Sequence, residues 1–364
     1  MNRMNRMNRM NRKHKRYGRR TIGYTKLIVG TAALAVLLTA CGGEKAVENK
    51  GKTGATGQPQ ATASTNTSAT QQPGNTATSK VQPEALAQEM LKGNFSGIYQ
   101  RFSDSFKEDV TEKEFSEMSA SFIAGVKSFT PGSVSLLNGG DQRFWKSDAG
   151  DKGITALFDP NGTIFQMAIT HLETHPDTDK IKTKIAYELP LRGDWYIFWG
   201  GNNEMENAHY SFAAQRYAYD IIRAVNHYSF KGDPLKNESY YAFGQNVLAP
   251  ADGTVVSVVN DIADNVPVGV MNEKHPAGNV VVIDHGGEYS YLAHLKKGSA
   301  TVKPGDKVKT GDVIGLLGNS GNSSEPHLHF QVSDGSDLYN SHAINIQWKN
   351  NLDPKKGMTV TVNP

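Results

Sequence analysis

The run Pro326-His327-Leu328-His329-Phe330, near the C-terminus, decides more about this chain than any other stretch. In an extended strand, alternate side chains point to the same face of the sheet. The two histidines therefore share one face, while Leu328 and Phe330 pack on the other. Imidazoles at this spacing can bind one metal ion, or one can bind metal while its neighbour transfers protons. An isolated His-x-His pair can also belong to a strand whose histidines face solvent, so the surrounding sequence has to decide.

Short strands separated by glycines surround this run from about residue 200 onward. Three blocks stand out: Ala249-Pro250-Ala251-Asp252-Gly253-Thr254-Val255, Ala293-His294-Leu295 and Pro304-Gly305-Asp306-Lys307-Val308-Lys309-Thr310-Gly311. Strands joined by tight turns at this spacing predict an antiparallel β-sandwich or a sheet with a groove. The third block alone also suits biotin or lipoate carrier domains, but those domains have no use for a His-x-His pair.

The order of these blocks closely resembles that of the lysostaphin/LytM-like zinc endopeptidases, which cut peptide bonds in bacterial peptidoglycan. The resemblance covers roughly residues 200–345 and includes the blocks quoted above together with His-Leu-His-Phe. It implies a mainly β, lysostaphin-like metallopeptidase domain over residues 201–364, with one zinc ion per chain and peptidoglycan peptides as its substrate.

The same resemblance assigns roles to individual histidines. His329 matches a zinc ligand, whereas His294 and His327 match the pair that handles protons beside the metal. The scheme is physically coherent, because three protein ligands leave a fourth zinc position for water, whose pKa falls to about 7. A nearby imidazole can then carry the proton to the departing amine.

The remaining ligands are where this chain departs from the family pattern. Most members show His-x-x-x-Asp, but the corresponding stretch here is Arg216-Tyr217-Ala218-Tyr219-Asp220. A guanidinium stays protonated and cannot bind zinc, so Arg216 does not replace the imidazole. Asp220 fits the carboxylate ligand, and we expect the missing imidazole from His209, with His227 as the alternative. We also consider an ion pair between Arg216 and Asp220.

Residues 83–200 predict a small α+β accessory domain ahead of the metallopeptidase domain. Apolar residues recur at helical steps between Leu86 and Phe102, and Thr111 to Glu114 has the spacing of a helix capping box. Apolar strands then flank the turn Asp159-Pro160-Asn161-Gly162. This order of elements looks like the nuclear-transport-factor-two-like domains of secreted bacterial proteins, which implies a role in positioning or binding rather than catalysis.

The start of the chain indicates export. Residues 1–26 hold ten Lys/Arg and no acidic residue, and an apolar segment leads into Leu38-Thr39-Ala40-Cys41. This resembles a bacterial lipobox and implies a lipoprotein signal peptide over residues 1–40, with Cys41 as the lipidated first residue. The expected location is the extracytoplasmic face of the cell membrane. An ordinary signal peptide or a short anchor is the alternative, although a membrane span needs about 20 apolar residues.

Residues 41–82 predict a disordered tether, because they are rich in small and polar residues that bury too little surface to offset ordering. Without the leader, the chain holds 29 Lys/Arg against 36 Asp/Glu, a net charge of about −7 instead of +3. We see no basic patch interleaved with aromatic residues, so nucleic acid is not expected as a partner. No sequence feature indicates an oligomeric state.

Two functional classes follow from these observations. The first is a membrane-tethered zinc metalloendopeptidase that hydrolyses peptidoglycan peptides during cell wall remodelling. The second is a catalytically inactive relative that binds the wall or activates another hydrolase. Inactive relatives usually lose one or more metal ligands. This chain keeps Asp220, His294, His327 and His329, which favours the enzyme.

Overall fold

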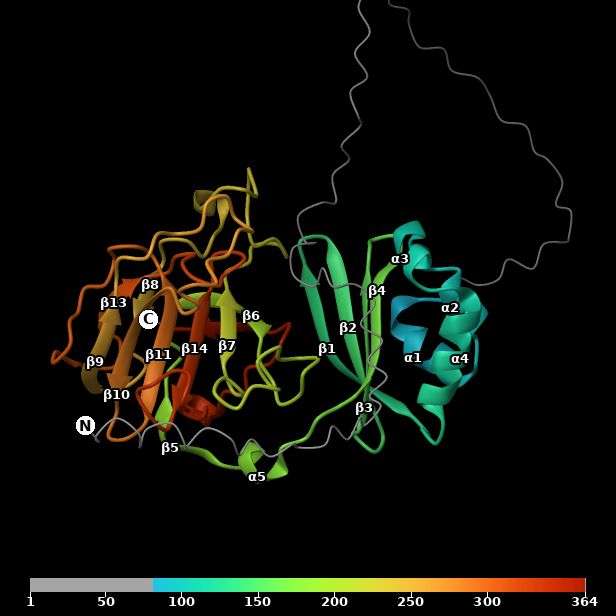
Figure 1. The fold of residues 1–364 in the computed structure, drawn as a ribbon, viewed down its shortest axis with the longest axis horizontal. Coiled ribbons are helices and arrows are strands. Elements are labelled where there is room, and N and C mark those ends of the chain that lie inside the picture. The colour runs from blue at the N-terminus through green and yellow to red at the C-terminus, as the bar shows by residue number, and fades with distance from the viewer. Residues whose placement is uncertain (1–80, 364) are drawn as a thin grey trace, which may run out of the picture.

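The computed structural model describes residues 81–363 (Figure 1). The proposed signal peptide of residues 1–40, Cys41 and nearly all of the tether lie outside the described residues, so these assignments stay predictions. The described chain folds into an N-terminal module, made of helices and one sheet, and a C-terminal module built around a larger sheet. α5 (Pro176–Asp179) lies in the linker between them.

The N-terminal module begins with short helices and ends with a meander of strands. Its helices are η2 (Pro83–Ala85), α1 (Leu86–Leu91), α2 (Phe95–Tyr99), α3 (Asp104–Asp109) and α4 (Glu112–Ile123). Its strands are β1 (Phe129–Leu137), β2 (Gly140–Ser147), β3 (Lys152–Phe158) and β4 (Ile164–His171), which pair in chain order. The capping box at the start of α4 is confirmed, since the Thr111 and Glu114 side chains each accept a bond from the other residue's backbone N–H.

The helices cover one face of this small sheet. Phe102, Phe106 and Phe115 from the helical part pack in one buried cluster with Ile154 and Phe158 of β3. Figure 1 shows the helices on the side of the molecule away from the C-terminal module. The predicted α+β region is therefore present, while its likeness to nuclear-transport-factor-two-like domains stays a prediction.

The C-terminal module centres on an eight-stranded antiparallel sheet. In spatial order its strands are β12 (Lys307–Val308), β9 (Gly253–Val259), β10 (Asn279–Asp284), β11 (Tyr289–Leu295), β14 (Leu328–Ser333), β7 (Tyr219–Ile222), β6 (Gly193–Trp199) and β16 (Thr359–Val362). Two strand pairs accompany it, namely β8 (Asn246–Leu248) with β13 (Val313–Leu316) and β5 (Lys182–Tyr187) with β15 (Asn345–Trp348). The short helices η3 (Asn237–Ser239) and η4 (Lys349–Asn351) lie in its connections.

The strands of residues 182–199 correct the sequence-based division of the chain at residue 200. β6 pairs with β7 and β16, and β5 pairs with β15, so both belong to the C-terminal module. The reason is burial, because Tyr187, Trp195 and Ile197 lie in the core of the large sheet. Their partners are more than 20 residues away along the chain, which local sequence patterns do not reveal.

Alternation along the strands separates an apolar face from a polar one. On β14, Leu328 and Phe330 are fully buried in the main core, and each contributes roughly 1.5–3 kcal/mol by leaving water. His329 and Gln331 point to the opposite face. The mainly β fold class predicted for this part of the chain is confirmed.

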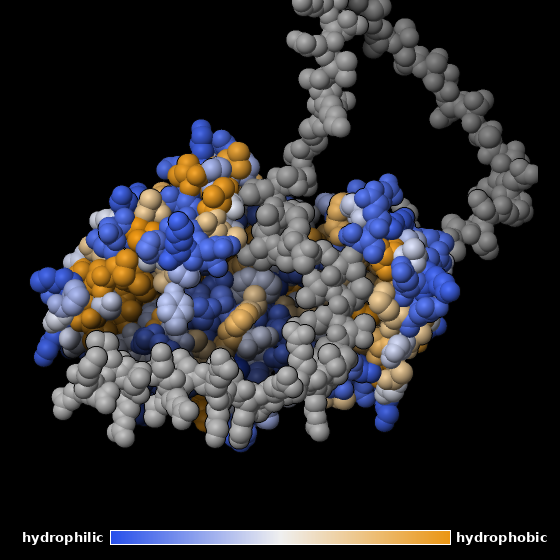
Figure 2. Space-filling view, in the orientation of Figure 1, coloured by the Kyte–Doolittle hydropathy of each residue, from blue (hydrophilic) through white to orange (hydrophobic). Residues whose placement is uncertain are grey.

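β1 of the N-terminal module packs against that opposite face, near its β6–β7 end. Leu137 forms a buried cluster with Tyr196 and Ile222, and Ser135 Oγ lies 2.6 Å from the Tyr196 hydroxyl. The N-terminal module therefore borders the polar face of the large sheet. Figure 2 shows a mostly hydrophilic surface, with apolar residues gathered at the end of the C-terminal module that carries β9, β10 and β13. Within residues 81–363, no helix has the length and apolar character needed to cross a membrane.

Candidate functional site

Strand register brings His329 and Asp220 together on the polar face of the large sheet. His329 on β14 is paired with Asp220 on β7 on one side and with Ala293 on β11 on the other. Directly opposed residues in an antiparallel sheet point to the same face. The alternation predicted for the His-x-His strand therefore places His329 beside Asp220, although the two residues are far apart in the sequence.

His209, Asp220 and His329 form a group that can hold a metal ion. One ligand atom from each lies within 4.8 Å of the others. His209 Nε2 is 3.1 Å from Asp220 Oδ2, and His329 Nδ1 is 3.0 Å from Asp220 Oδ1. The structure thus brings together the three residues that the sequence predicted as ligands, and their role in metal binding stays a prediction.

The hydrogen bonds of His329 test whether the group suits a cation. The Gln331 amide nitrogen donates to the Ala214 carbonyl oxygen (2.9 Å), so the Gln331 amide oxygen faces His329 Nε2 (2.9 Å). This oxygen can only accept, and therefore His329 Nε2 carries the proton and Nδ1 presents its lone pair to Asp220 when the ring is neutral. Lone pairs that face a carboxylate repel it unless a cation lies between them. The donor set fits a divalent metal, and zinc accepts these ligand types.

Electrostatics keep the carboxylate ionised. Burial opposes ionisation of Asp220, but the imidazoles of His209 and His327 hold its pKa well below its usual range. Burial also works against a charge on His209, yet the neighbouring Asp220 raises the pKa of His209 above its ordinary value. A carboxylate that remains charged inside the fold is the strongest single attraction for a cation at this position.

His294 and His327 lie next to this group with their rings oriented by backbone carbonyls. His294 Nδ1 donates to the Ser320 carbonyl oxygen at 2.8 Å, and His327 Nδ1 donates to the Glu325 carbonyl oxygen at 2.9 Å. Each ring therefore keeps an Nε2 lone pair when neutral. The ring centroids are 4.6 Å apart, and His327 Nε2 is 3.6 Å from Asp220 Oδ1. Burial lowers the pKa of both imidazoles.

The backbone at His294 is part of this orientation. Its φ is 62°, in the left-handed region that residues other than glycine rarely adopt. Its N–H donates to the Ala277 carbonyl oxygen at 3.1 Å. Strain of this kind persists only where the surroundings hold the residue in place, and it clusters at functional sites.

His209 lies on an irregular segment between β6 and β7, and Asn207 shapes that segment. The Asn207 amide nitrogen donates to the carbonyl oxygens of Gly201, Arg216 and Ala218 at 3.1–3.2 Å. Its amide oxygen accepts from the His209 N–H at 3.0 Å. Asn207 thus closes the loop that carries His209 to β7, a role that sequence reasoning missed. An Asn two residues before a candidate ligand is the local signal for such a turn.

The structure separates the other candidates from this group. His227, the alternative ligand, lies beside the N-terminal module, where its carbonyl oxygen accepts a bond from the Asn138 N–H at 2.7 Å. Arg216 does not pair with Asp220. Its Nε instead donates to the Tyr210 carbonyl oxygen at 3.0 Å. The Asp220 carboxylate instead lies against the imidazoles of His209, His327 and His329.

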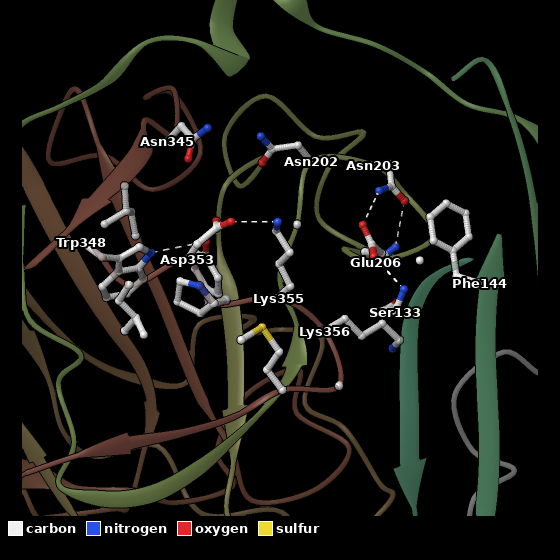
Figure 3. Close-up of a pocket in the computed structure, with 18 of the residues that line it drawn as sticks. Ser133, Phe144, Asn202, Asn203, Glu206, Asn345, Trp348, Asp353, Lys355 and Lys356 are labelled. Atoms are coloured by element: carbon white, nitrogen blue, oxygen red, sulfur yellow. Dashed lines mark hydrogen bonds and ion pairs between the residues drawn. The ribbon is translucent and has the colours of Figure 1, made fainter. Parts of the chain in front are cut away.

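A cavity of about 940 Å³ lies between the modules, and none of the five predicted site residues lines it. Figure 3 shows Asn203 and Glu206 joined by a hydrogen bond on one side, next to Ser133 of β1, with Trp348 on the other. The Ser133 N–H donates to Glu206 Oε1 at 3.2 Å. This cavity is a feature of the junction between the modules.

Histidines and a carboxylate thus converge on one face of an antiparallel sheet, an arrangement that can hold a metal ion beside groups able to transfer protons. Residues 239–345 match the model of peptidase family M23, so this part of the chain is an M23 domain. The matched residues include His294, His327 and His329 but not His209 or Asp220. The roles predicted for all five residues stay predictions.

Individual relatives are similar over the same part of the chain. A 94-residue stretch is 45% identical to the peptidoglycan DD-endopeptidase ShyA of Vibrio cholerae, covering 25% of this chain and 21% of that protein. An 81-residue stretch is 40% identical to the glycyl-glycine endopeptidase ALE-1 of Staphylococcus capitis, covering 22% and 21% respectively. The matches span about a fifth of these relatives. The catalytic domain of lysostaphin from Staphylococcus simulans aligns over 32% of this chain and 85% of that domain, with 25% identity and a TM-score of 0.21.

Proposed function

We propose that this chain is a zinc-dependent endopeptidase that hydrolyses peptide bonds of bacterial peptidoglycan. The observation that carries the proposal is the convergence of His209, Asp220 and His329 beside two further histidines. Three of these five residues lie in the part of the chain that matches family M23. Relatives named as peptidoglycan DD-endopeptidase and glycyl-glycine endopeptidase support the substrate class.

The residues present can hold one zinc ion through His209 Nε2, His329 Nδ1 and a carboxylate oxygen of Asp220. Zinc supplies Lewis acidity at such a site and lowers the pKa of a coordinated water. Gln331 fixes the tautomer of His329, and Asp220 provides the negative charge that offsets part of the metal's charge. Partners of ligating histidines of this kind strengthen metal binding.

His294 and His327 supply the acid–base chemistry in this proposal. Their Nδ1 protons are held by the Ser320 and Glu325 carbonyl oxygens, so each Nε2 can accept a proton from the attacking water. The same Nε2 can return that proton to the departing amine, which leaves the ring neutral for the next turnover. The ring that takes up the water proton becomes a cation, and its Nε2–H can donate to the developing oxyanion before the proton passes to the amine. The second ring lies close by, with its centroid 4.6 Å away.

The site of action belongs to the same proposal. Lipidation at Cys41 would hold the chain at the extracytoplasmic face of the cell membrane, with the segment up to residue 82 as a tether to the folded modules. This assignment rests on the lipobox-like sequence alone.

The test is to incubate the zinc-loaded full-length chain with purified peptidoglycan and to identify the fragments by mass spectrometry. His329→Ala is the inactive variant, and His342→Ala, whose side chain is 72% exposed, is the matched control. New amine-ended peptides from the wild type and the control alone support the endopeptidase. Intact muropeptides from a wild-type chain that binds zinc would instead favour the wall-binding or activating role.

A further inference from the structure

The segment between β6 and β7 that carries His209 contains no helix or strand, so contacts from elsewhere must fix its position. α5, in the linker between the modules, provides one. Asp179, the last residue of α5, accepts hydrogen bonds from the hydroxyls of Tyr210, at 2.8 Å and 3.0 Å, and of Tyr217, at 2.9 Å. We propose that Asp179 is a positioning residue for the metal site, because its carboxylate holds both tyrosines and thereby places His209 against Asp220.

The two tyrosines transmit this restraint to the candidate ligands. Tyr210 directly follows His209, and Tyr217 lies three residues before Asp220. One carboxylate therefore joins both ends of the loop of residues 210–217. Both tyrosines are buried, with 0% and 3% of their surface exposed, in a cluster with Ala343. Because the Tyr210 ring is packed on all sides and has no solvent to move into, a shift of the ring must move the backbone next to His209.

The groups around Asp179 hold the same arrangement from several sides. The His175 N–H donates to the Tyr210 hydroxyl at 3.2 Å, and the Tyr217 hydroxyl lies 2.7 Å from Thr178 Oγ1. The Asn345 amide donates to the Asp179 carbonyl oxygen at 2.7 Å and ties α5 to β15. Bonds to an ionised carboxylate are about twice as strong as neutral ones, so Asp179 is the centre of the network. The linker is thereby coupled to the metal site.

This inference rests on the proposed metal centre, and zinc affinity tests it without any measurement of cleavage. The full-length chain would be titrated with zinc in competition with a chromophoric chelator. We expect Asp179→Ala to weaken zinc binding by about 10–100-fold, the usual cost of losing a residue that orients a ligand. Asp179→Asn, which keeps an acceptor oxygen, should lose less. Asp177→Ala on the same helix is the matched control, since the Asp177 side chain is 99% exposed, and it should bind zinc as the wild type does.

A double-variant cycle separates positioning from a general structural role. If Asp179 acts by placing His209, the combined variant Asp179→Ala/His209→Ala should bind zinc no more weakly than His209→Ala alone. The absorption spectrum of the cobalt-substituted Asp179→Ala variant should resemble that of His209→Ala. The proposal would be overturned if the losses of zinc affinity of the two single variants add in the double variant. A zinc affinity of Asp179→Ala within about twofold of the wild type would also overturn it. A chain that shows the expected cycle but cleaves no peptidoglycan would refute the proposed function and leave this inference standing.

Discussion

Replacing Gln331 by leucine tests whether the tautomer of His329 matters for zinc binding. Gln331 is fully buried, and its amide oxygen accepts the bond from His329 Nε2. In the metal-free Gln331→Leu variant, His329 can carry its proton on Nδ1 and donate to Asp220, so the loss of the Gln331 oxygen destabilises this state little. In the zinc-bound variant, Nδ1 must stay unprotonated in order to bind the ion. The proton therefore stays on Nε2, where it is buried without an acceptor, and this costs roughly 1–3 kcal/mol. Since 1.4 kcal/mol is tenfold, we expect zinc binding to weaken by about 5–150-fold.

The assay is competition for zinc against a chelator of known affinity near neutral pH, with circular dichroism to check that the metal-free variant remains folded. Gln347→Leu, at an exposed position of β15, is the control and should not change the zinc affinity. A folded Gln331→Leu variant whose zinc affinity stays within about twofold of the wild type would refute the tautomer argument. It would also remove the main reason for regarding the donor set as suited to a cation.

Three further outcomes are expected. Burial raises the pKa of Glu325 from 4.5 to about 7, so the folded chain binds this proton more tightly and its stabilising effect is lost as pH rises between these values. Glu325→Gln should therefore be as stable as the wild type at about pH 4.5 and more stable at about pH 8, by up to roughly 3 kcal/mol in the free energy of unfolding. A stability difference that does not change with pH would contradict this. His209→Ala should lower peptidoglycan cleavage by at least about tenfold, whereas His227→Ala should leave it unchanged; the reverse result would move the ligand to His227. Cys41→Ser should release the chain from the membrane fraction, and retention of the variant there would argue against lipidation.

Local patterns were sufficient to predict the parts of the site that lie within single strands. The alternation of His327-Leu328-His329-Phe330 determined which side chains face the core, and the structure places them so. Asp220 could be located in the same way, because Tyr219 packs in the core and its neighbour must point to the other face. The capping box of α4 was predictable because its two residues are only three positions apart.

Contacts between segments far apart in the chain could not be predicted from local sequence patterns. Nothing local links Asp179 to Tyr210, because the bond between them depends on how the linker lies against the C-terminal module. For the same reason, Arg216 could be considered a partner of Asp220, although it donates to a carbonyl oxygen of its own loop. β6 was assigned to the wrong module because its pairing partners, β7 and β16, lie later in the chain.

The pairing of β16 with β6 has a consequence for how this protein can be produced. The family match ends at residue 345, whereas β16 spans Thr359–Val362. A recombinant chain cut at residue 345 would leave the outer backbone groups of β6 without partners, next to the aromatic side chains of Tyr196 and Phe198. Unprotected edge strands recruit strands from other molecules, so such a fragment should aggregate. The C-terminal limit for a soluble preparation is therefore set by the last strand of the sheet and not by the limit of recognisable homology.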